Sequence, residues 1–452
     1  MTASPLSASA IAIRGAFLDL LHDPFLADEA ECVRYIPDGL LVVDQGVIQA
    51  FGAYNELREA YGQLPTTEYG DRLILPGFID IHIHYPQTEV IASYGAQLLD
   101  WLNTYTFPAE GRFADATYAD TLAHFFLDEL LRHGTTTALV LTTVFPQSVT
   151  AFFEAAHQRN MRMVAGQVLM TRNAPDFLLN EAKVAQAQTR EQIQTWHGKG
   201  RQLYAITPRF AITSTPEELT LAGELKAEFP DVYVHTHLSE NHAEIAFTAE
   251  LFPDAPDYLG VYEQFGLLGD RSIFAHCLHL SESEFERMAA AGGAIAFCPS
   301  SNLFLGSGLF KLDRAKAGGI RVGLATDVGG GTHFSMFYTM AEAYKVLQLQ
   351  GYSLSPFKSL YLATLGAAHS LALEDKLGNF QVGKEADFIV VDRQATPLLA
   401  LRNAGAVPQN HKALAEQLFT LIVLGDDRAI AATYIAGNLA YERSADLNPM
   451  PH

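Results

Sequence analysis

Residues 76–84 of this 452-residue chain read Pro-Gly-Phe-Ile-Asp-Ile-His-Ile-His. The apolar residues of this run predict a buried β-strand. Because strand side chains alternate between two faces, His82 and His84 project to the same side. Two imidazoles on one strand face favour a metal site of the zinc type, although a hydrogen-bonded pair in a polar patch explains His-x-His alone about as well. The pair lies at the C-terminal end of the expected strand, which is where parallel barrels have their active sites.

Outward from this run, short apolar segments alternate with longer amphipathic ones. The expected strands cover residues 73–83, 136–141, 162–169, 203–207, 232–237, 272–276, 294–298 and 322–326. Helices are expected between them, for example at 119–133 and 216–228, where Thr215-Pro216-Glu217-Glu218 supplies a capping hydroxyl, a first-turn proline and acidic residues. This alternation predicts an α/β fold, a (β/α)8 TIM-like barrel. An open doubly wound sheet is the alternative, but the Gly306–Gly308 segment lacks the third glycine of a dinucleotide-binding loop.

The two ends of the chain have a different pattern. Residues 40–52 read LLVVDQGVIQAFG, which predicts two short strands about an Asp-Gln-Gly turn. Residues 385–392 and 432–442 also predict strands, whereas 396–420 is expected to be a loop with a helix. We therefore expect a small composite β-sandwich domain from residues 1–75 and 376–452, next to a catalytic barrel of residues 76–375.

Composition excludes several classes of protein. Hydrophobic residues make up 49% and charged residues 18%, which is ample for a large core and excludes a disordered chain. The formal net charge of −21 argues against nucleic acid and anionic membrane surfaces as partners. The three cysteines cannot form a disulfide framework, the first 15 residues do not resemble a signal peptide, and no apolar run is long enough for a membrane helix. A cytoplasmic location is expected.

More polar residues follow apolar runs later in the chain. His237 and Glu240 lie at the end of the fifth expected strand, His276 ends the sixth, and Asp327 follows the eighth. All of them should meet at one barrel mouth, where several unpaired buried polar groups would be costly. Three histidines and a carboxylate supply four metal ligands with room for a water molecule. The pattern therefore predicts a metal-dependent active site.

Spacing alone leaves some assignments open. His235 shares a strand face with His237, and His279 competes with His276. We interpret both His235 and His279 as core histidines or as supports behind the metal ligands. His242-Ala243-Glu244 matches the His-x-Glu of cytidine-deaminase zinc sites, but no Pro-Cys-x-x-Cys accompanies it. We interpret residues 242–244 as helix surface.

Several separate strings resemble the guanine deaminases of the amidohydrolase superfamily. They are PGFIDIHIHYPQ, LLDWLNTYTFPAEGRF, HGTTTA, TPRFAIT, HLSEN, AHCLHLSESE, AFCPSSNLFLGSG and LATDVGGG. The resemblance covers essentially the whole chain. PGFIDIHIH and the single Asp after the last strand are typical of the superfamily, whereas Gln87, WLNTYTFPAE and TPRF are specific to this family.

Carried over by position, the resemblance implies a role for each matching residue. It assigns His82, His84, His237 and Asp327 to one zinc ion, Gln87, Arg209 and Phe210 to purine contact together with His237, Glu240 and Asp327, and Glu240, Asp327 and His276 to catalysis. The same ligands would accept iron. Residues 203–210 contain no lysine of the kind that bridges two metals in binuclear barrels, so one metal is expected. The resemblance also implies a homodimer with guanine as its small-molecule partner.

The implied chemistry is hydrolytic deamination of guanine to xanthine and ammonia. Zinc lowers the pKa of bound water to about 7, and the resulting hydroxide would attack C2 of the purine. Glu240 would protonate the ring nitrogen beside C2, and Asp327 would pass the hydroxide proton towards the leaving ammonia. Arg209 donates hydrogen bonds suited to the O6 acceptor, so adenine, with an amino group there, should be rejected.

Two rival functions are weighed against this one. A related deaminase or chlorohydrolase could act on 8-oxoguanine, a pterin, a triazine or an adenosine-like compound; TPRF and Gln87 argue against it. A non-catalytic barrel scaffold is the second rival. The intact set of predicted ligands and Glu240 argues against a scaffold.

Overall fold

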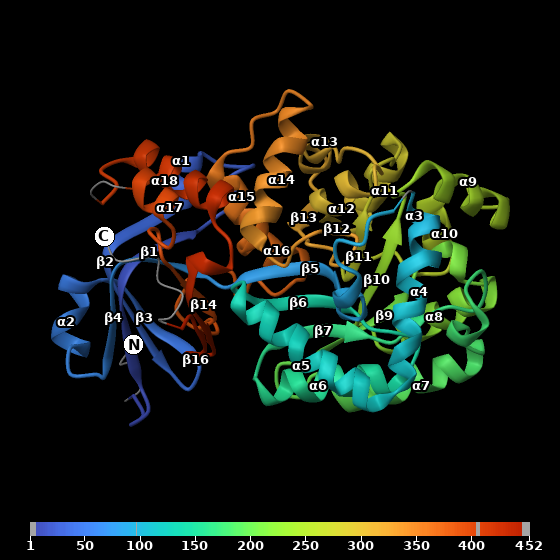
Figure 1. The fold of residues 1–452 in the computed structure, drawn as a ribbon, viewed down its shortest axis with the longest axis horizontal. Helices are drawn as coiled ribbons and strands as arrows, with labels where there is room; N and C mark the ends of the chain where they lie inside the picture. Colours follow the sequence, from blue (N-terminus) through green and yellow to red (C-terminus); the bar gives the residue numbers. More distant parts are fainter. Residues whose placement is uncertain (1–5, 96, 404–406, 445–452) are drawn as a thin grey trace.

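The computed structural model describes residues 6–95, 97–403 and 407–444. Figure 1 shows two parts, a helix-covered barrel and a separate sheet to its left. In the described residues the barrel has eight parallel strands in chain order, apart from the short β8 (Val168–Leu169), which pairs with β9. They are β5 (Phe78–His84), β6 (Thr135–Leu141), β7 (Arg162–Gly166), β9 (Leu203–Pro208), β10 (Tyr233–Leu238), β11 (Ser272–His276), β12 (Ala294–Phe297) and β13 (Arg321–Leu324).

The first and last barrel strands meet where the functional residues are predicted. The amide of His84 donates to the carbonyl of Val328 at 2.9 Å, and the amide of Asp327 donates to the carbonyl of His82 at 3.0 Å. The buried Asp80 carboxylate accepts the amide of Thr326 at 3.2 Å. These bonds join the end of β5 to the segment after β13, and the predicted TIM-like barrel is confirmed.

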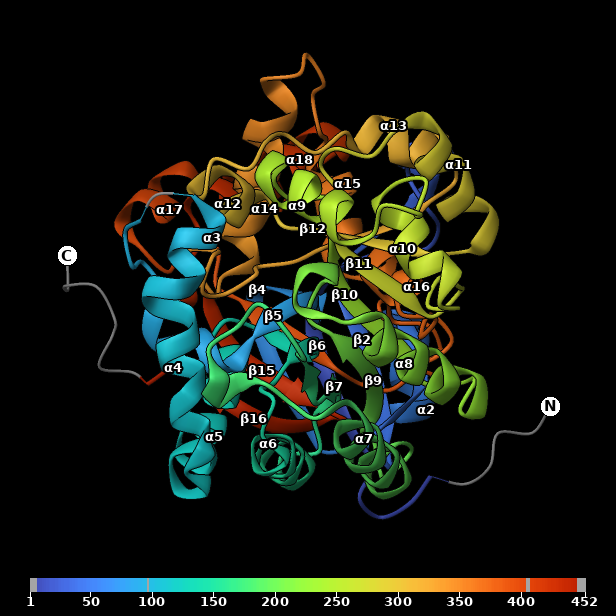
Figure 2. The ribbon, with the colours of Figure 1, turned by 90° about the vertical axis from the view of Figure 1, so that its right-hand side faces the viewer.

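Helices surround these strands, as Figure 2 shows for α5 to α8. The helices are α1 (Glu29–Cys32), α2 (Tyr54–Tyr61), α3 (Leu98–Trp101), α4 (Phe107–Gly111), α5 (Ala116–Arg132), α6 (Pro146–Gln158), α7 (Ala182–Trp196), α8 (Pro216–Glu228), α9 (His242–Leu251), α10 (Tyr258–Gln264), α11 (Glu282–Ala291), α12 (Pro299–Phe304), α13 (Leu312–Ala317), α14 (Met336–Gln348), α15 (Pro356–Ala363), α16 (Leu365–Ser370), α17 (Pro397–Arg402) and α18 (His411–Leu424). The predicted cap of α8 is present, because the Thr215 hydroxyl accepts the amide of Glu218 at 3.3 Å.

Strands from both termini form the second part, as predicted. Its seven described strands lie in the order β16-β15-β14-β4-β1-β2-β3. Their bounds are β1 (Ile11–Leu20), β2 (Val33–Asp44), β3 (Val47–Ala53), β4 (Thr66–Pro76), β14 (Phe388–Val391), β15 (Ile430–Ile435) and β16 (Asn438–Glu442). Gln45 and Gly46 form the turn between β2 and β3 with φ values of 52° and 80°. Register shifts in β1 bend this one sheet around an apolar core that includes Phe17 and Phe388. The predicted domain bounds, 1–75 with 376–452 and 76–375, stay a prediction.

The expected strand at 73–83 is wrong as one element. It is divided at Gly77 into β4 of the terminal sheet and β5 of the barrel. The Gly77 amide donates to the carbonyl of Asp387, and a Cβ at this position would lie 2.2 Å from the Thr136 hydroxyl. Only glycine therefore lets the chain pass between the two sheets here. The expected strand at 162–169 is likewise divided, into β7 and β8.

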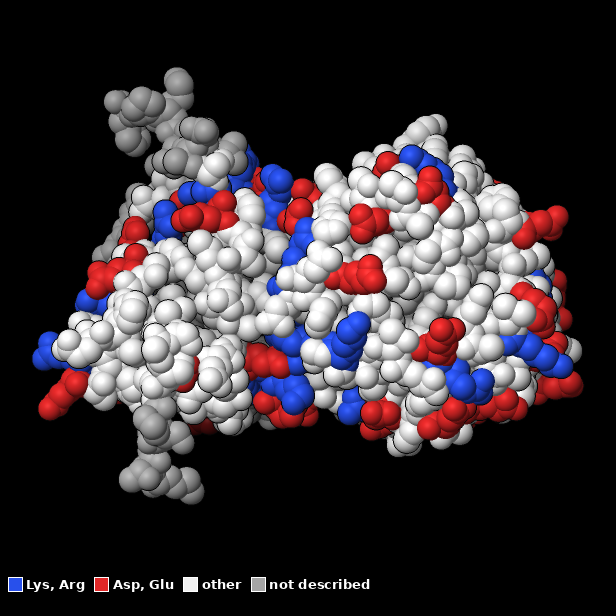
Figure 3. Space-filling view, turned by 90° about the horizontal axis from the view of Figure 1, so that it is seen from below, with Lys and Arg blue, Asp and Glu red and all other residues white. Residues whose placement is uncertain are grey.

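Charged side chains join the two parts. Arg201, at the start of β9, donates to Glu385 at 2.6 Å and also pairs with Asp387, both just before β14. Figure 3 shows acidic and basic side chains mixed over the lower face, with both signs gathered at this junction. All three cysteines are buried free thiols. Among the described residues, no helix is long and apolar enough to cross a membrane.

Candidate active site

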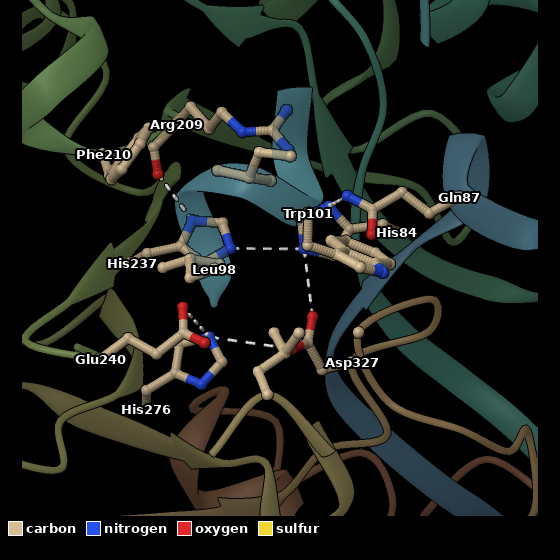
Figure 4. Close-up of a pocket in the computed structure, with 13 residues that line it drawn as sticks. His84, Gln87, Leu98, Trp101, Arg209, Phe210, His237, Glu240, His276 and Asp327 are labelled. Carbon is tan, nitrogen blue, oxygen red and sulfur yellow. Dashed lines mark hydrogen bonds and ion pairs between the residues drawn. The ribbon is translucent and has the colours of Figure 1, made fainter. Parts of the chain in front are cut away.

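Five polar side chains, four of them buried and one half-buried (His237), converge at the C-terminal ends of the barrel strands. His82 and His84 come from β5, His237 from β10, His276 from the end of β11, and Asp327 follows β13. The Nε2 atom of His84 lies 3.2 Å from that of His82 and 3.3 Å from that of His237. One Asp327 oxygen lies 3.2 Å from both β5 imidazoles, and its other oxygen lies 3.8 Å from His276. Figure 4 shows four of them, His84, His237, His276 and Asp327, around one cavity.

The spacing of these atoms fits a divalent metal ion. Ligand atoms about 2.0 Å from a tetrahedral zinc ion are roughly 3.3 Å from each other, which matches the separations between the Nε2 atoms. Burial lowers the pKa of His82 to about 4 and that of His237 well below its usual value, so both imidazoles are neutral near pH 7. Lone pairs of neutral imidazoles repel each other unless a cation lies between them. Ligand atoms of His82, His237, His276 and Asp327 all lie within 4.8 Å of one another.

Hydrogen bonds behind the cluster set the tautomers of two of its histidines, His237 and His276. His237 Nδ1 bonds the carbonyl of Arg209 at 2.7 Å, so Nε2 carries the lone pair. His276 Nδ1 bonds the amide oxygen of Asn302 at 2.8 Å, with the same effect. His82 Nδ1 lies 2.7 Å from Nε2 of His235. The Nε2 lone pairs of His237 and His276 thus face the centre of the cluster.

Asp327 supplies the negative charge of the cluster. Burial alone would raise the pKa of its carboxyl, but His82, His84 and His276 together hold that pKa well below its usual value. The side chain is therefore ionised near pH 7, as a metal ligand must be. The amide of Gly331 donates to the carbonyl of Asp327, which places the turn at residues 329–331 directly behind it.

Glu240 and His276 form a second pair beside this cluster. A Glu240 carboxylate oxygen lies 3.4 Å from Nε2 of His276, and the other accepts the Ser307 hydroxyl at 3.2 Å. Burial raises the pKa of Glu240 to about 7 despite the nearby imidazole. Burial opposes protonation of His276, yet Glu240 and Asp327 raise its pKa overall. A carboxyl that titrates near 7 in a cleft is suited to move protons in both directions.

The backbone is strained where these side chains leave their strands. Ser239, His276 and Asp327 have positive φ values of 51°, 71° and 51°, which non-glycine residues rarely adopt. Each such residue costs on the order of 1–3 kcal/mol, and strain of this kind clusters at functional sites. The strain turns the side chains at the strand ends towards the cavity.

A cavity lies directly above the cluster and opens towards the surface. Its lining residues are His84, Gln87, Leu98, Trp101, Leu102, Arg209, Phe210, His237, Glu240, His276, Leu305, Asp327 and Gly330. Eight of the nine predicted site residues are among them, and the ninth, His82, lies directly behind and bonds His235. The apolar lining from α3 and the polar groups opposite it suit a flat, partly polar ring.

The prediction for Glu244 was wrong, and the structure places His279 away from the cluster. Glu244, predicted to lie on a helix surface, is fully buried and accepts the amides of Glu240 and Asn241 at 2.8 and 3.0 Å. It therefore holds the loop that carries Glu240, and the signal for it was present, since an Asn followed three residues later by Glu is a capping-box pattern. His279 lies outside the cluster and bonds the carbonyl of Ser307 at 2.9 Å.

Sequence reasoning gave no role to Glu110 on α4. Its buried carboxylate accepts two hydrogen bonds from Arg209 Nη1, at 2.8 and 2.7 Å. Glu110 is part of the string LLDWLNTYTFPAEGRF, but no local pattern indicates its pairing, because its partner lies 99 positions away in the sequence.

Known proteins are similar to this chain in sequence and in fold. A model of the Amidohydrolase family matches residues 73–440. The guanine deaminase of Escherichia coli (strain K12) is 52% identical over 438 residues, which cover 96% of this chain and 98% of that protein. A solved structure of E. coli guanine deaminase superposes with a TM-score of 0.93, covering 96% of this chain and all of that one. A structure of guanine deaminase from C. acetobutylicum with bound guanine in the active site gives a TM-score of 0.86 at 27% identity, with 96% and 100% covered.

Proposed function

The chain belongs to the amidohydrolase family, and we propose that it catalyses the hydrolytic deamination of guanine to xanthine and ammonia. The observation that carries this proposal is the convergence of a metal-type donor cluster, Glu240 and Arg209 on one cavity. The 52% identity to a guanine deaminase over nearly the whole chain supports the same substrate.

His82, His84, His237 and Asp327 would hold the metal, which we propose to be zinc, with iron as the alternative. A divalent metal in such a site lowers the pKa of a water molecule to about 7 and so makes it nucleophilic at neutral pH. Asp327 would accept a proton from the attacking water, because its ionised carboxylate lies among the proposed ligands. His276, held by Asn302, orients the water through Nε2.

Glu240 carries the proton transfers at the purine. Protonation of the ring nitrogen next to C2 makes C2 electrophilic, so water adds there and the 2-amino group leaves as ammonia. One water is consumed and one ammonia is released, which leaves an oxygen at C2. The pKa of Glu240 near 7 lets the same carboxyl donate and accept protons at neutral pH.

Arg209, Gln87 and Phe210 would recognise the base. Arg209 lines the cavity and has further N–H groups besides the one that bonds Glu110. These donors suit the O6 acceptor of guanine and face an amino group in adenine. Gln87 Nε2 bonds His84 Nδ1 at 3.1 Å, so it also connects the base-binding residues to the metal ligands.

The experiment is an ammonia-release assay with purified protein on guanine, adenine, 8-oxoguanine, a pterin and a triazine. We expect guanine to be preferred, metal analysis to give about one zinc per chain, and chelation to abolish turnover until zinc is restored. A preference for another ring would assign the same chemistry to that substrate. Full activity in metal-free protein, or no ammonia from any compound, would contradict the proposal.

A homodimer is a further part of the proposal. Helices α17 and α18 expose the apolar side chains Leu398, Leu401 and Val423, which supports burial of this region by a second chain. Sedimentation at micromolar concentration tests it, and a monomer mass would contradict it.

A further inference from the structure

Glu110 lies in a segment that the described chemistry does not use. The π-helical turn Leu102–Thr106 leads into α4, and the Glu110 side chain there is only 1% exposed. Both of its carboxylate oxygens accept from Nη1 of Arg209, at 2.8 and 2.7 Å. A buried carboxylate is strongly destabilising unless it is paired in this way. The Arg209 side chain is equally buried, at 2% exposed.

The geometry of this pair restricts the Arg209 side chain. Only one guanidinium nitrogen bonds Glu110, so the pair is not the two-pronged fork that would occupy two nitrogens. The guanidinium carbon also lies 5.3 Å from the centre of the Phe107 ring, which belongs to the same helix α4. Helix α4 thus contacts Arg209 in two ways: Glu110 bonds its Nη1 atom, and the Phe107 ring lies against its guanidinium group. The remaining N–H groups are left for the cavity, where Arg209 lies opposite Glu240 and Asp327 in Figure 4.

Glu110 also reaches the second predicted base-contacting residue. Gln87 Nε2 donates to Glu110 Oε1 at 3.4 Å, and Gln87 Oε1 accepts the backbone amide of Gly329 at 3.2 Å. One carboxylate therefore contacts two side chains that lie in the segments after different barrel strands, β5 and β9. It is a negative charge placed behind the donors, where a ligand carbonyl cannot reach it.

We propose that Glu110 is a positioning residue for substrate specificity: it fixes Arg209, with Gln87 held beside it, so that the free donors of Arg209 select a purine with an oxygen at C6. The inference rests on the proposed function. Glu110 acts through Arg209 and touches no reacting atom, so its loss should weaken binding of the 6-oxo group while the metal cluster and the proton transfers stay intact.

The test compares Glu110→Gln with wild type and with Glu284→Gln, a buried carboxylate that caps α11 outside the cavity. For guanine we expect KM to rise at least tenfold in Glu110→Gln, with kcat changed less than threefold and zinc content unchanged. Titration calorimetry on the zinc-loaded proteins uses two probes, hypoxanthine, which has the 6-oxo group, and unsubstituted purine, which lacks it. Glu110→Gln should weaken hypoxanthine at least tenfold and leave purine within twofold, and Glu284→Gln should change neither.

Two further variants keep the test decisive. Because Glu110 acts through Arg209, the double variant Glu110→Gln/Arg209→Gln should lose no more affinity for hypoxanthine than Arg209→Gln alone. Equal losses for hypoxanthine and purine, or additive losses in the double variant, would overturn the proposal; if Glu110→Gln does not fold, Glu110→Asp is held to the same criteria. If the wild-type protein releases no ammonia from guanine, but Glu110→Gln still weakens hypoxanthine binding as expected, the proposed reaction alone is overturned. If the wild type releases no ammonia from guanine and Glu110→Gln binds hypoxanthine as tightly as wild type, both the proposed reaction and the proposed role of Glu110 are overturned.

Discussion

Glu240 reaches the cavity because of two neighbours in its own loop. Ser239 adopts a φ of 51°, which turns the chain at the end of β10, and Glu244 then holds the amides of Glu240 and Asn241. The Tyr258 hydroxyl in turn donates to Glu244 at 2.8 Å. A proton-transfer residue on a loop is therefore positioned as firmly as one on a strand. This precision matters because proton transfer requires hydrogen-bond distance.

Replacement of Glu240 by Gln separates proton transfer from packing. The amide keeps the shape and the hydrogen bond from Ser307 but cannot carry a proton at neutral pH. We expect kcat for guanine to fall by about 10²- to 10⁴-fold, the usual contribution of a general acid or base, with zinc content unchanged. Steady-state kinetics and metal analysis on the same preparation check this. A kcat near that of wild type would remove Glu240 from the mechanism.

His235 provides a second test at the residue scale. Its Nε2 atom lies 2.7 Å from Nδ1 of His82, and both rings are fully buried. A partner of this kind orients a metal-binding imidazole, and its loss typically costs 10- to 100-fold in metal affinity. We expect that loss for His235→Phe and a smaller one for His235→Gln, whose amide oxygen can accept from His82. Competition with a zinc chelator measures both, and unchanged affinity in His235→Phe would contradict this role.

At the scale of elements, local signals decided what was predictable. Helix α8 has its predicted bounds because Thr215 and Pro216 define its start within four residues of sequence. The strand ends of the site were predictable because a polar residue follows each apolar run. The break at Gly77 was not, because it depends on contact with Thr136, and hydrophobicity does not say which sheet a residue joins. Glu110 was missed for a related reason, because its partner Arg209 lies 99 positions away. Glu244 was missed although its local capping-box pattern with Asn241 was present.

The first turn of α8 contains a testable pH effect. Burial raises the pKa of Glu218 from 4.5 to about 7, and the hydroxyls of Ser214 and Thr171 and the charge of Arg172 offset only part of the shift. The folded state therefore binds this proton more tightly than the unfolded state. The protonated Glu218 side chain stabilises the folded state fully below pH 4.5, and this stabilisation is lost as the pH rises through 7. The free energy of unfolding changes by about 3 kcal/mol over this range.

Glu218→Gln should remove this pH dependence. We expect the variant to match wild type near pH 4.5 and to be more stable by up to about 3 kcal/mol at pH 8, where wild type carries a buried charge. Urea unfolding at the two pH values measures the difference. Glu217→Gln, at the exposed neighbouring position in the same turn, is the matched control and should show no such gain. Equal stability of Glu218→Gln and wild type at pH 8 would contradict the argument.

At the scale of the whole molecule, the terminal sheet is joined to the pole of the barrel opposite the active site. Arg201 precedes β9, and Arg162 begins β7, so both lie at N-terminal strand ends. Arg162 donates to Glu385 at 2.8 Å, and the Asp387 carboxylate also accepts the amide of Ala436 at 2.7 Å. Ionic contacts thus connect the barrel to residues 385–387, and a hydrogen bond connects Asp387 to the turn that follows β15. The catalytic end stays free of these contacts, so stability and chemistry are carried by opposite ends of the barrel.

Arg201→Met tests this separation. Removing one partner of a buried ion pair typically costs about 3–5 kcal/mol because the remaining carboxylate loses its compensation. We expect a loss of that size in urea unfolding, while kcat for guanine stays within twofold in the folded protein. Arg190→Met, which breaks the exposed pair with Glu228, should cost no more than about 1 kcal/mol. Both tryptophans, Trp101 and Trp196, lie in the barrel, so their fluorescence follows the barrel while far-ultraviolet circular dichroism follows both parts. If Arg201→Met were as stable as Arg190→Met, the joint would owe its strength to apolar packing, and the ionic account of it would be wrong.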